Sequence, residues 1–303
     1  MSTPQYTRLE GRGLLSISGE DRIDFLQGLI SNDVTNVSPD QSLYGAMLTA
    51  QGKFLHDFFI FAVAEDIFLD CEAARLDDLK KRLTMYKLRA KVEISDRSDD
   101  FNVYGVFGKG VTGALGLNDQ PGATGPFGGG IACMDPRLTD IGARALLTDA
   151  SALDDAGCDA TVMESYEQLR LKLGLADGSR DMIVDKAILL ENGFEELNGV
   201  SWDKGCYTGQ ELTARTHYRG LIKKRLMPVH ITGPMPTPGT AITLGDAAAG
   251  EMRSGSGDVG VALIRLEQFR TAIADGKPLQ AGEASLMPTQ PDWASFPEPA
   301  SED

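Results

Sequence analysis

Residues 204–211 read Lys-Gly-Cys-Tyr-Thr-Gly-Gln-Glu and form the most informative stretch of this 303-residue chain. Two glycines bracket its cysteine and tyrosine. Because glycine has no side chain, the backbone here can turn sharply or approach a ligand closely while Cys206 and Tyr207 point at one site. The stretch therefore predicts a loop with a functional role.

Positive charge is concentrated in and just after this stretch. Residues 204–225 hold six basic side chains and one acidic side chain, a local charge of +5, in a chain whose net charge is −15. Such a cluster suits the carboxylate or phosphate groups of a small ligand. It is equally compatible with a solvated strand edge on which lysines prevent aggregation. The acidic balance of the whole chain predicts no binding to nucleic acid.

Cys206 is one of four cysteines, and their wide spacing excludes a C-x-x-C pair of the kind found in zinc knuckles and redox sites. So few cysteines in so long a chain fit a reducing compartment. A free cysteine is most often a small buried apolar residue. Nearby lysine and arginine side chains would instead lower the pKa of Cys206 and favour a reactive or metal-ligating thiolate. Both interpretations of Cys206 stay open.

The start of the chain and its apolar runs bear on its location. Residues 1–13 lack the apolar run of a signal peptide. The longest purely apolar run, residues 58–64, has the length of a strand and is far too short to span a membrane. We therefore expect a soluble, cytoplasmic protein that does not associate with membranes.

The pattern of the remaining chain predicts an α+β protein. A capped amphipathic helix after Ser18, a hairpin that turns at Gly52 and a helix over residues 73–90 alternate with β-prone runs. Nine glycines between residues 108 and 130 predict a loop at a seam between two lobes. Beyond residue 223, short β-prone runs alternate with Pro/Gly turns as in a small barrel or sandwich. The expected regions are α+β lobes over 1–222, a β-barrel over 223–287 and a disordered tail over 288–303.

Residues 204–211 match K-G-C-Y-x-G-Q-E, the signature of the YgfZ family of folate-binding proteins, which is related to the glycine-cleavage T-protein, an aminomethyltransferase. The continuation Leu-Thr-Ala-Arg-Thr-His at residues 212–217 resembles in particular the mitochondrial branch of this family, which assists iron–sulfur assembly. The resemblance covers about residues 8–265. Further matching stretches are residues 21–33, 135–144 and 198–201.

The resemblance implies aminomethyltransferase-like α+β lobes around a central tetrahydrofolate cavity, followed by a small C-terminal β-barrel. It implies that Glu191 grips the pterin ring, since a carboxylate accepts two hydrogen bonds from the amino-pyrimidinone edge. Arg170 matches a T-protein arginine, with ion pairing and ligand contact as alternatives. Asp57 aligns with a carboxylate assigned to folate chemistry, where it would orient or accept a proton. The alternative for Asp57 is an aspartate that simply ends a hairpin strand.

The leading hypothesis from this resemblance is a tetrahydrofolate-binding accessory factor for the assembly or repair of iron–sulfur enzymes, with Cys206 as the working group. One cysteine supplies a single ligand where a cluster commonly uses four, so any cluster would be shared with a partner. We expect folate, cluster carrier proteins and client enzymes as partners. The other candidate cofactor-binding residues near Cys206 are Lys204, Tyr207, Arg215 and Arg219.

Two other functions stay open on the sequence alone. The chain could be a folate-dependent one-carbon transferase that uses Asp57 as its acid/base group, or a non-catalytic interaction scaffold. An assembly factor is favoured over a glycine-cleavage enzyme because the T-protein lacks the cysteine of the signature. Whether the protein is an enzyme is therefore undecided.

Overall fold

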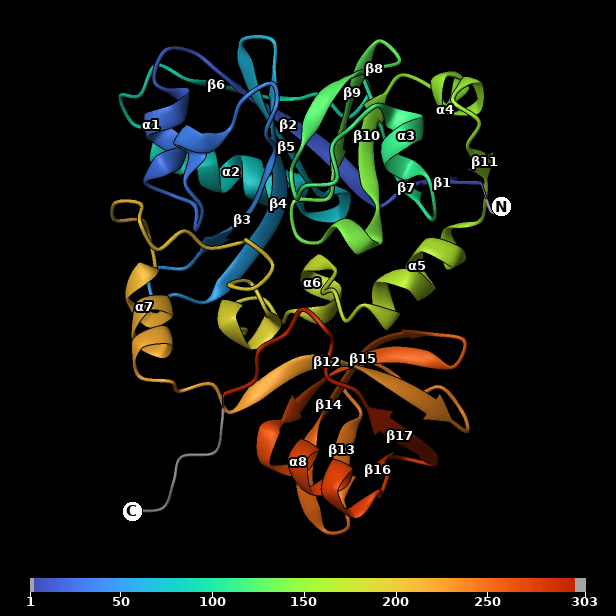
Figure 1. Ribbon diagram of the computed structural model, residues 1–303. Helices are drawn as coiled ribbons and strands as arrows, with labels where there is room; N and C mark the ends of the chain where they lie inside the picture. Colours follow the sequence, from blue (N-terminus) through green and yellow to red (C-terminus); the bar gives the residue numbers. More distant parts are fainter. Residues whose placement is uncertain (1–2, 298–303) are drawn as a thin grey trace. The chain divides into compact units, whose positions relative to one another are not determined.

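The computed structural model describes residues 3–297, and these fall into two compact units (Figure 1). Each unit gathers segments that are distant in the sequence. Unit 1 contains residues 3–50, 54–166 and 197–208, and unit 2 contains residues 51–53, 167–196 and 209–297.

The first layer of unit 1 is a five-stranded antiparallel sheet with the order β3-β4-β5-β2-β6. Its apolar face packs on α1 and α2, whose buried side chains include Leu26 and Leu79. The predicted helix over residues 73–90 is found as a 3-10 turn followed by α2. The elements are β2 (Arg12–Ser18), α1 (Arg22–Gln27), η1 (Val34–Asn36), β3 (Leu43–Leu48), β4 (Phe54–Val63), β5 (Asp66–Glu72), η2 (Ala73–Arg75), α2 (Leu76–Lys87) and β6 (Glu93–Asp96).

A second sheet of unit 1 has six strands in the order β11-β1-β7-β10-β9-β8, antiparallel except for the pairing of β11 with β1. The glycine-rich residues 108–130 lie within this part of unit 1, where they form a short helix and strand β8. The elements are β1 (Gln5–Arg8), β7 (Asn102–Phe107), α3 (Val111–Leu115), β8 (Thr124–Phe127), β9 (Gly130–Met134), η3 (Thr139–Ile141), β10 (Ala143–Leu147), α4 (Ser151–Asp155) and β11 (Asp159–Ala160).

Unit 2 is built on a closed six-stranded barrel, β12-β15-β14-β13-β16-β17, in which β17 returns to pair with β12. Closure leaves no unpaired strand edge, and α8 adds apolar side chains to the barrel core. The elements are β12 (Lys224–Thr232), β13 (Ala241–Leu244), β14 (Ala247–Ser256), β15 (Val259–Arg265), α8 (Leu266–Asp275), β16 (Leu279–Ala281) and β17 (Ala284–Pro288).

Short helices precede the barrel in the chain. Helix α5 begins in unit 1 and ends in unit 2, and α7 contacts η4 within unit 2. Within residues 3–297, no helix has both the length and the apolar character that a bilayer span requires. The elements are α5 (Met163–Lys172), α6 (Gly178–Asp181), η4 (Leu189–Asn192) and α7 (Gln210–Tyr218).

The segment that follows the barrel differs from the predicted disordered tail, which was expected to begin at residue 288. Trp293 donates a hydrogen bond from Nε1 to the carbonyl oxygen of Leu173 at 2.7 Å. The ring of Phe296 packs edge-on against Phe269, with 5.6 Å between the ring centroids. These apolar side chains hold the segment on unit 2 despite its prolines. The rest of the predicted tail, residues 298–303, lies outside the described residues.

Candidate functional site

Cys206 lies on an irregular loop of unit 1 and is exposed. The other three cysteines, Cys71, Cys133 and Cys158, are buried, and burial raises the pKa of each thiol. The structure therefore excludes only the interpretation of Cys206 as a small buried apolar residue. Cys206 is the thiol of the chain that solvent and partners can reach.

Lys204, two residues earlier, is 7% exposed and points its ammonium group into unit 1. Its Nζ donates hydrogen bonds to the backbone oxygens of Gln27, Ile30 and Asn32, at 2.9, 2.7 and 2.6 Å. The ammonium also lies 5.1 Å from the centroid of the Tyr207 ring. Lys204 and Tyr207 were both predicted to bind a cofactor. In the structure, the Lys204 side chain binds backbone oxygens inside unit 1 and so anchors the loop.

The charge of Lys204 is under two opposing influences. Burial lowers the pKa of Lys204 to about 8, and the Asp33 carboxylate opposes that shift. Three carbonyl oxygens within hydrogen-bond distance also favour the charged amine. At neutral pH the side chain is therefore a buried cation that is paired with backbone oxygens.

The two glycines of the signature have different surroundings. Gly209 has a φ of +83°, in the left-handed region that favours glycine. Gly205 has no such φ, and a Cβ placed on it would meet no atom within 4 Å apart from its chain neighbours. Backbone conformation therefore calls for glycine at 209, whereas neither conformation nor packing within the described chain calls for it at 205.

Hydrogen bonds join the other stretches that carried the family resemblance. Asn32 donates from Nδ2 to the backbone oxygen of Asn198 at 2.8 Å, and Ser31 donates from Oγ to that of Gly199 at 2.6 Å. Asn198 in turn donates to the backbone oxygen of Pro136 at 3.1 Å. Residues 31–32, 136, 198–199 and 204 thus form one connected network in unit 1.

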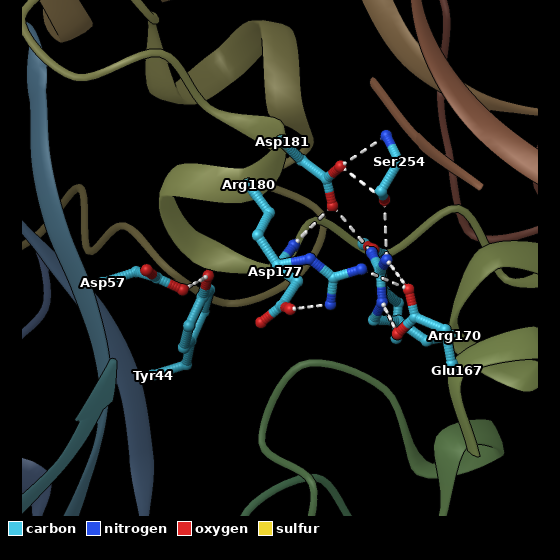
Figure 2. Close-up of polar contacts among 9 residues, drawn as sticks. Tyr44, Asp57, Glu167, Arg170, Asp177, Arg180, Asp181 and Ser254 are labelled. Atoms are coloured by element: carbon cyan, nitrogen blue, oxygen red, sulfur yellow. Dashed lines mark hydrogen bonds and ion pairs between the residues drawn. The ribbon is translucent and has the colours of Figure 1, made fainter. Parts of the chain in front are cut away.

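Asp57 lies on β4 and is buried. It pairs across the ladder with Ala46 of β3, so Tyr44, two residues along β3, is its diagonal neighbour. The Tyr44 hydroxyl donates to Asp57 Oδ2 at 2.9 Å (Figure 2). Burial raises the pKa of Tyr44 well above its ordinary value, so the phenol stays a neutral donor. Asn32 also binds the backbone oxygen of Tyr44, which links this pair to the network around Lys204.

A buried ion-pair network lies near this pair and was not foreseen from the sequence, which marked residues 135–144 only as a matching stretch. Arg137 grips Asp135 with two hydrogen bonds of 3.0 and 2.9 Å, and Arg144 donates to Asp70 at 2.7 Å. The guanidinium carbon of Arg144 stands 3.5 Å from the centroid of the Phe59 ring. Burial alone would raise the pKa of Asp135, but the two arginines hold it below its usual range. The network ties β4 and β5 to β10 within unit 1.

Arg170 lies on α5 in unit 2, and its five N–H donors are all used within that unit. It donates to both carboxylate oxygens of Glu167, to Asp181, to the hydroxyl of Ser254 and to the backbone oxygen of Leu175 (Figure 2). Burial alone would lower the pKa of Arg170, but the carboxylates raise it. Of the two alternatives for Arg170, this geometry corresponds to ion pairing that joins α5 to α6 and the barrel.

Glu191 lies on the η4 turn of unit 2 and is half-buried. Burial raises the pKa of its carboxyl group, and the positive charges of Lys224, Lys53 and Arg253 oppose that shift. Within the described residues, no hydrogen bond or ion pair reaches this carboxylate. A desolvated carboxylate without an internal partner has the chemistry expected of a group that receives N–H donors from a ligand.

The basic run of residues 204–225 is not a single surface. Arg215 and Arg219, on and just after α7, are exposed, as is Lys223. Arg225 is 1% exposed and forms an ion pair with Glu196 at 2.6 Å. The exposed arginines remain available to an anionic ligand or partner, whereas Arg225 belongs to the core of unit 2.

Metal-ligating side chains are not grouped in the part of the chain that the structure describes. Within residues 3–297, no three or more His, Cys, Asp and Glu side chains are arranged to hold a metal ion. Cys206 therefore offers one sulfur ligand, and the other ligands of any cluster must come from elsewhere.

The comparisons with known proteins agree with this architecture. Residues 10–112 match the GCVT N-terminal domain, and residues 223–296 match the C-terminal beta-barrel domain of CAF17. The crystal structure of the glycine cleavage system aminomethyltransferase T from Bartonella henselae superposes with a TM-score of 0.71 at 14% identity. It covers 97% of this chain and 87% of that one. The predicted aminomethyltransferase-like fold with a C-terminal β-barrel is confirmed.

Relatives of known name overturn one prediction. The sequence led us to expect a cytoplasmic protein, but the similar human and mouse proteins are both named as mitochondrial. The expectation rested on few cysteines and on a polar start of the chain. Neither feature separates the cytoplasm from another reducing compartment, so the cytoplasmic prediction is wrong.

Full-length similarity then identifies the family. The iron-sulfur cluster assembly factor IBA57, mitochondrial, from Homo sapiens is 33% identical over 306 residues, which cover 94% of this chain and 84% of the human protein. The protein of the same name from Mus musculus is also 33% identical, over 315 residues and with the same shares covered. With a GCVT-type N-terminal domain, a CAF17-type barrel and this degree of identity, the chain belongs to the IBA57 family.

Proposed function

We propose that this chain is an iron–sulfur cluster assembly factor that acts through Cys206. Its human and mouse relatives carry that function in their names. The observation that carries the proposal is the exposure of Cys206, the one reachable thiol of four, on a loop that Lys204 anchors. The sulfur is presented to solvent while its backbone is tied down, as a thiol that must meet a partner requires.

The proposed chemistry at Cys206 is ligation of a cluster that is cargo. The thiol loses its proton to solvent, and the thiolate sulfur forms one bond to iron while one thiolate ligand of the carrier or small thiol leaves that iron and takes up a proton, with no change in oxidation state. Because a cluster commonly takes four protein ligands, the remaining ones come from a carrier protein, a client enzyme or a small thiol. The proposed partners are therefore carriers and clients of iron–sulfur clusters.

We further propose that a tetrahydrofolate binds to unit 2 through Glu191. The support is the half-buried carboxylate that lacks an internal partner, to which the N–H groups of a pterin would donate. The exposed Arg215 and Arg219 would hold the anionic tail of the folate. The predicted role of Asp57 in folate chemistry stays a separate proposal within unit 1, where Tyr44 already orients its carboxylate. When bound, the folate supplies a carrier for one-carbon units.

The role of Cys206 is tested by complementation in a strain that lacks the gene for this chain. We expect Cys206→Ala to abolish recovery of iron–sulfur enzyme activity while its thermal unfolding matches that of the wild type. Cys158→Ala is the matched control, because it removes the same sulfur from a buried site, and it should restore activity. Full recovery with Cys206→Ala would refute the proposal.

The folate site is tested by anaerobic calorimetry with tetrahydrofolate. Glu191→Gln should weaken binding by about tenfold or more, because a hydrogen bond to a charged group contributes about 1.5 to 3 kcal/mol. Glu283→Gln, which changes an exposed carboxylate in the turn before β17, serves as the control. Equal affinities for the two variants would remove Glu191 from the site.

A further inference from the structure

The signature lysine, Lys204, has a structural task within unit 1. Its ammonium has three N–H bonds, and three backbone oxygens lie within 2.9 Å of the nitrogen. All three acceptors belong to residues 27–32, which follow or end α1, more than 170 residues away in the sequence. The side chain is thus fully used in one contact between two segments of unit 1.

The acceptor segment needs such a donor. The last carbonyl groups of a helix have no partner within the helix, and they favour a nearby cation. Helix α1 has only six residues and no basic residue in its last turn. Lys204 supplies from a distant part of the chain the positive charge that the last turn of α1 lacks.

A second contact ties the other side of the cysteine to the same segment. The backbone N–H of Thr208 donates to the backbone oxygen of Gly28 at 3.0 Å. Residues 205–207 therefore span two fixed points, Lys204 on one side and Thr208 on the other. Cys206 lies at the middle of this short bridge and is exposed.

We infer that Lys204 is a positioning residue, which holds the bridge over residues 205–207 against the end of α1 and so fixes the direction in which Cys206 presents its sulfur. The inference rests on the proposed function in one respect, namely that the sulfur of Cys206 must meet a partner. The side chain of Lys204 neither touches cargo nor ligates it. Its hydrogen bonds restrict the loop to one defined geometry in the free protein. The loop therefore loses less conformational entropy when a partner binds.

The test uses Cys206 as its own reporter. Because the other cysteines are buried, a methanethiosulfonate spin label attaches selectively at Cys206 of the full chain. In the wild type we expect a spectrum with restricted motion. In Lys204→Met, which keeps the length of the side chain and removes its donors, we expect the rotational correlation time to shorten by at least about threefold. Lys204→Gln, which retains two N–H donors on a shorter stem, should give an intermediate value.

Two controls separate positioning from general stability. Leu83→Ala removes core contacts of α2 in the same unit and should leave the label's mobility unchanged even where its unfolding midpoint falls as far. Lys223→Met makes the same change at an exposed lysine of the basic run and should also leave it unchanged. Hydrogen exchange provides a second measurement, in which the amide of Thr208 should exchange faster in Lys204→Met than in either control.

The outcomes are decisive in both directions. Restricted motion of the label in Lys204→Met, or equal mobility in Lys204→Met and Leu83→Ala, would overturn the positioning role. A mobile label in Lys204→Met alone supports it. Neither result depends on complementation by Cys206→Ala, so a failure of the proposed function would be recognised separately.

Discussion

The Lys204 loop of unit 1 and the Glu191 turn of unit 2 each keep a charged side chain where burial disfavours the charge. Burial lowers the pKa of Lys204 to about 8 and raises that of Glu191. The ammonium of Lys204 has three backbone oxygens as partners, whereas the carboxylate of Glu191 has none among the described residues. The same physical cost therefore has two outcomes, an internal anchor in one loop and an open acceptor in the other.

The presence or absence of hydrogen-bond partners distinguishes a buried charge with a structural role from one that is open to a ligand. A buried charge is tolerated when hydrogen bonds compensate for the lost hydration, and these are present in full around Lys204. Where they are absent, the group keeps water, takes up a proton or receives donors from a ligand, and perturbed groups of this kind gather at functional sites. Arg170 resembles Lys204 in this respect, because all its N–H donors are used within unit 2 and its role is structural.

The largest effect is expected from removing the anchor. Lys204→Met leaves buried backbone oxygens of Ile30 and Asn32 without their donor, and we expect the free energy of unfolding to fall by about 2 to 4 kcal/mol. Urea unfolding at pH 7 measures this, with Lys223→Met expected to stay within about 0.5 kcal/mol of the wild type. Equal losses in the two variants would mean that the three bonds of Lys204 contribute nothing.

The dependence of stability on pH tests the buried charge of Lys204 further. The pKa of Lys204 is about 8 in the native state and 10.5 ordinarily, so between these values the unfolded chain binds more protons. The free energy of unfolding should therefore rise with pH in this window, by up to about 3 kcal/mol relative to Lys204→Met. Asp33, the carboxylate nearby, has a pKa lowered chiefly by its hydrogen bond with Thr35 and stays charged throughout. A difference that does not change between pH 8 and 10.5 would contradict this.

Neutralising Glu191 should raise the free energy of unfolding, whereas removing the amine of Lys204 should lower it. Because the pKa of Glu191 is raised in the native state, its contribution to stability is present at low pH and lost as pH rises through the native pKa. Glu191→Gln removes this cost and should raise the free energy of unfolding at pH 7 by about 1 kcal/mol or less. Chemical unfolding of wild type and variant measures the difference. A clear loss of stability would show that Glu191 has an internal partner and would end the contrast with Lys204.

The smallest effect on stability is expected at Cys206. Cys206→Ala changes an exposed side chain and should leave the free energy of unfolding within about 0.5 kcal/mol of the wild type. Cys133→Ala, at a fully buried position, should lower it by about 1 kcal/mol or more, because it leaves a cavity. Urea unfolding of the two variants side by side tests this. Comparable losses would place the sulfur of Cys206 in a packed environment, against its observed exposure.

Much of the fold could be predicted because it depends on local patterns. Apolar spacing identified α2. Pro/Gly turns between short β-prone runs indicated a small barrel or sandwich, and the family resemblance selected the barrel that the structure has. The tail was missed because Trp293 finds its hydrogen-bond partner at Leu173, 120 residues away in the sequence. No local pattern signals such a contact.

The site was predictable in its residue types and not in their partners. The signature pointed to Cys206, but only the packing of the chain shows that its sulfur is exposed while Lys204 turns inward. The sequence could not separate the two alternatives for Arg170, because Ser254 and Asp181 come from other elements. The buried pair of Arg137 and Asp135 had one available signal, two opposite charges flanking a proline, which sequence analysis did not use.

The open surroundings of Gly205 have a practical consequence. Since a methyl group fits there without displacing any described atom, alanine can be introduced next to Cys206 with little effect on the native chain, and we expect larger residues to extend from it into open space. A series of increasing side-chain volume at this position would then act as a ruler for how closely an incoming macromolecule must approach the sulfur. If the proposed function holds, the volume at which recovery of iron–sulfur enzyme activity stops would measure the clearance at that encounter.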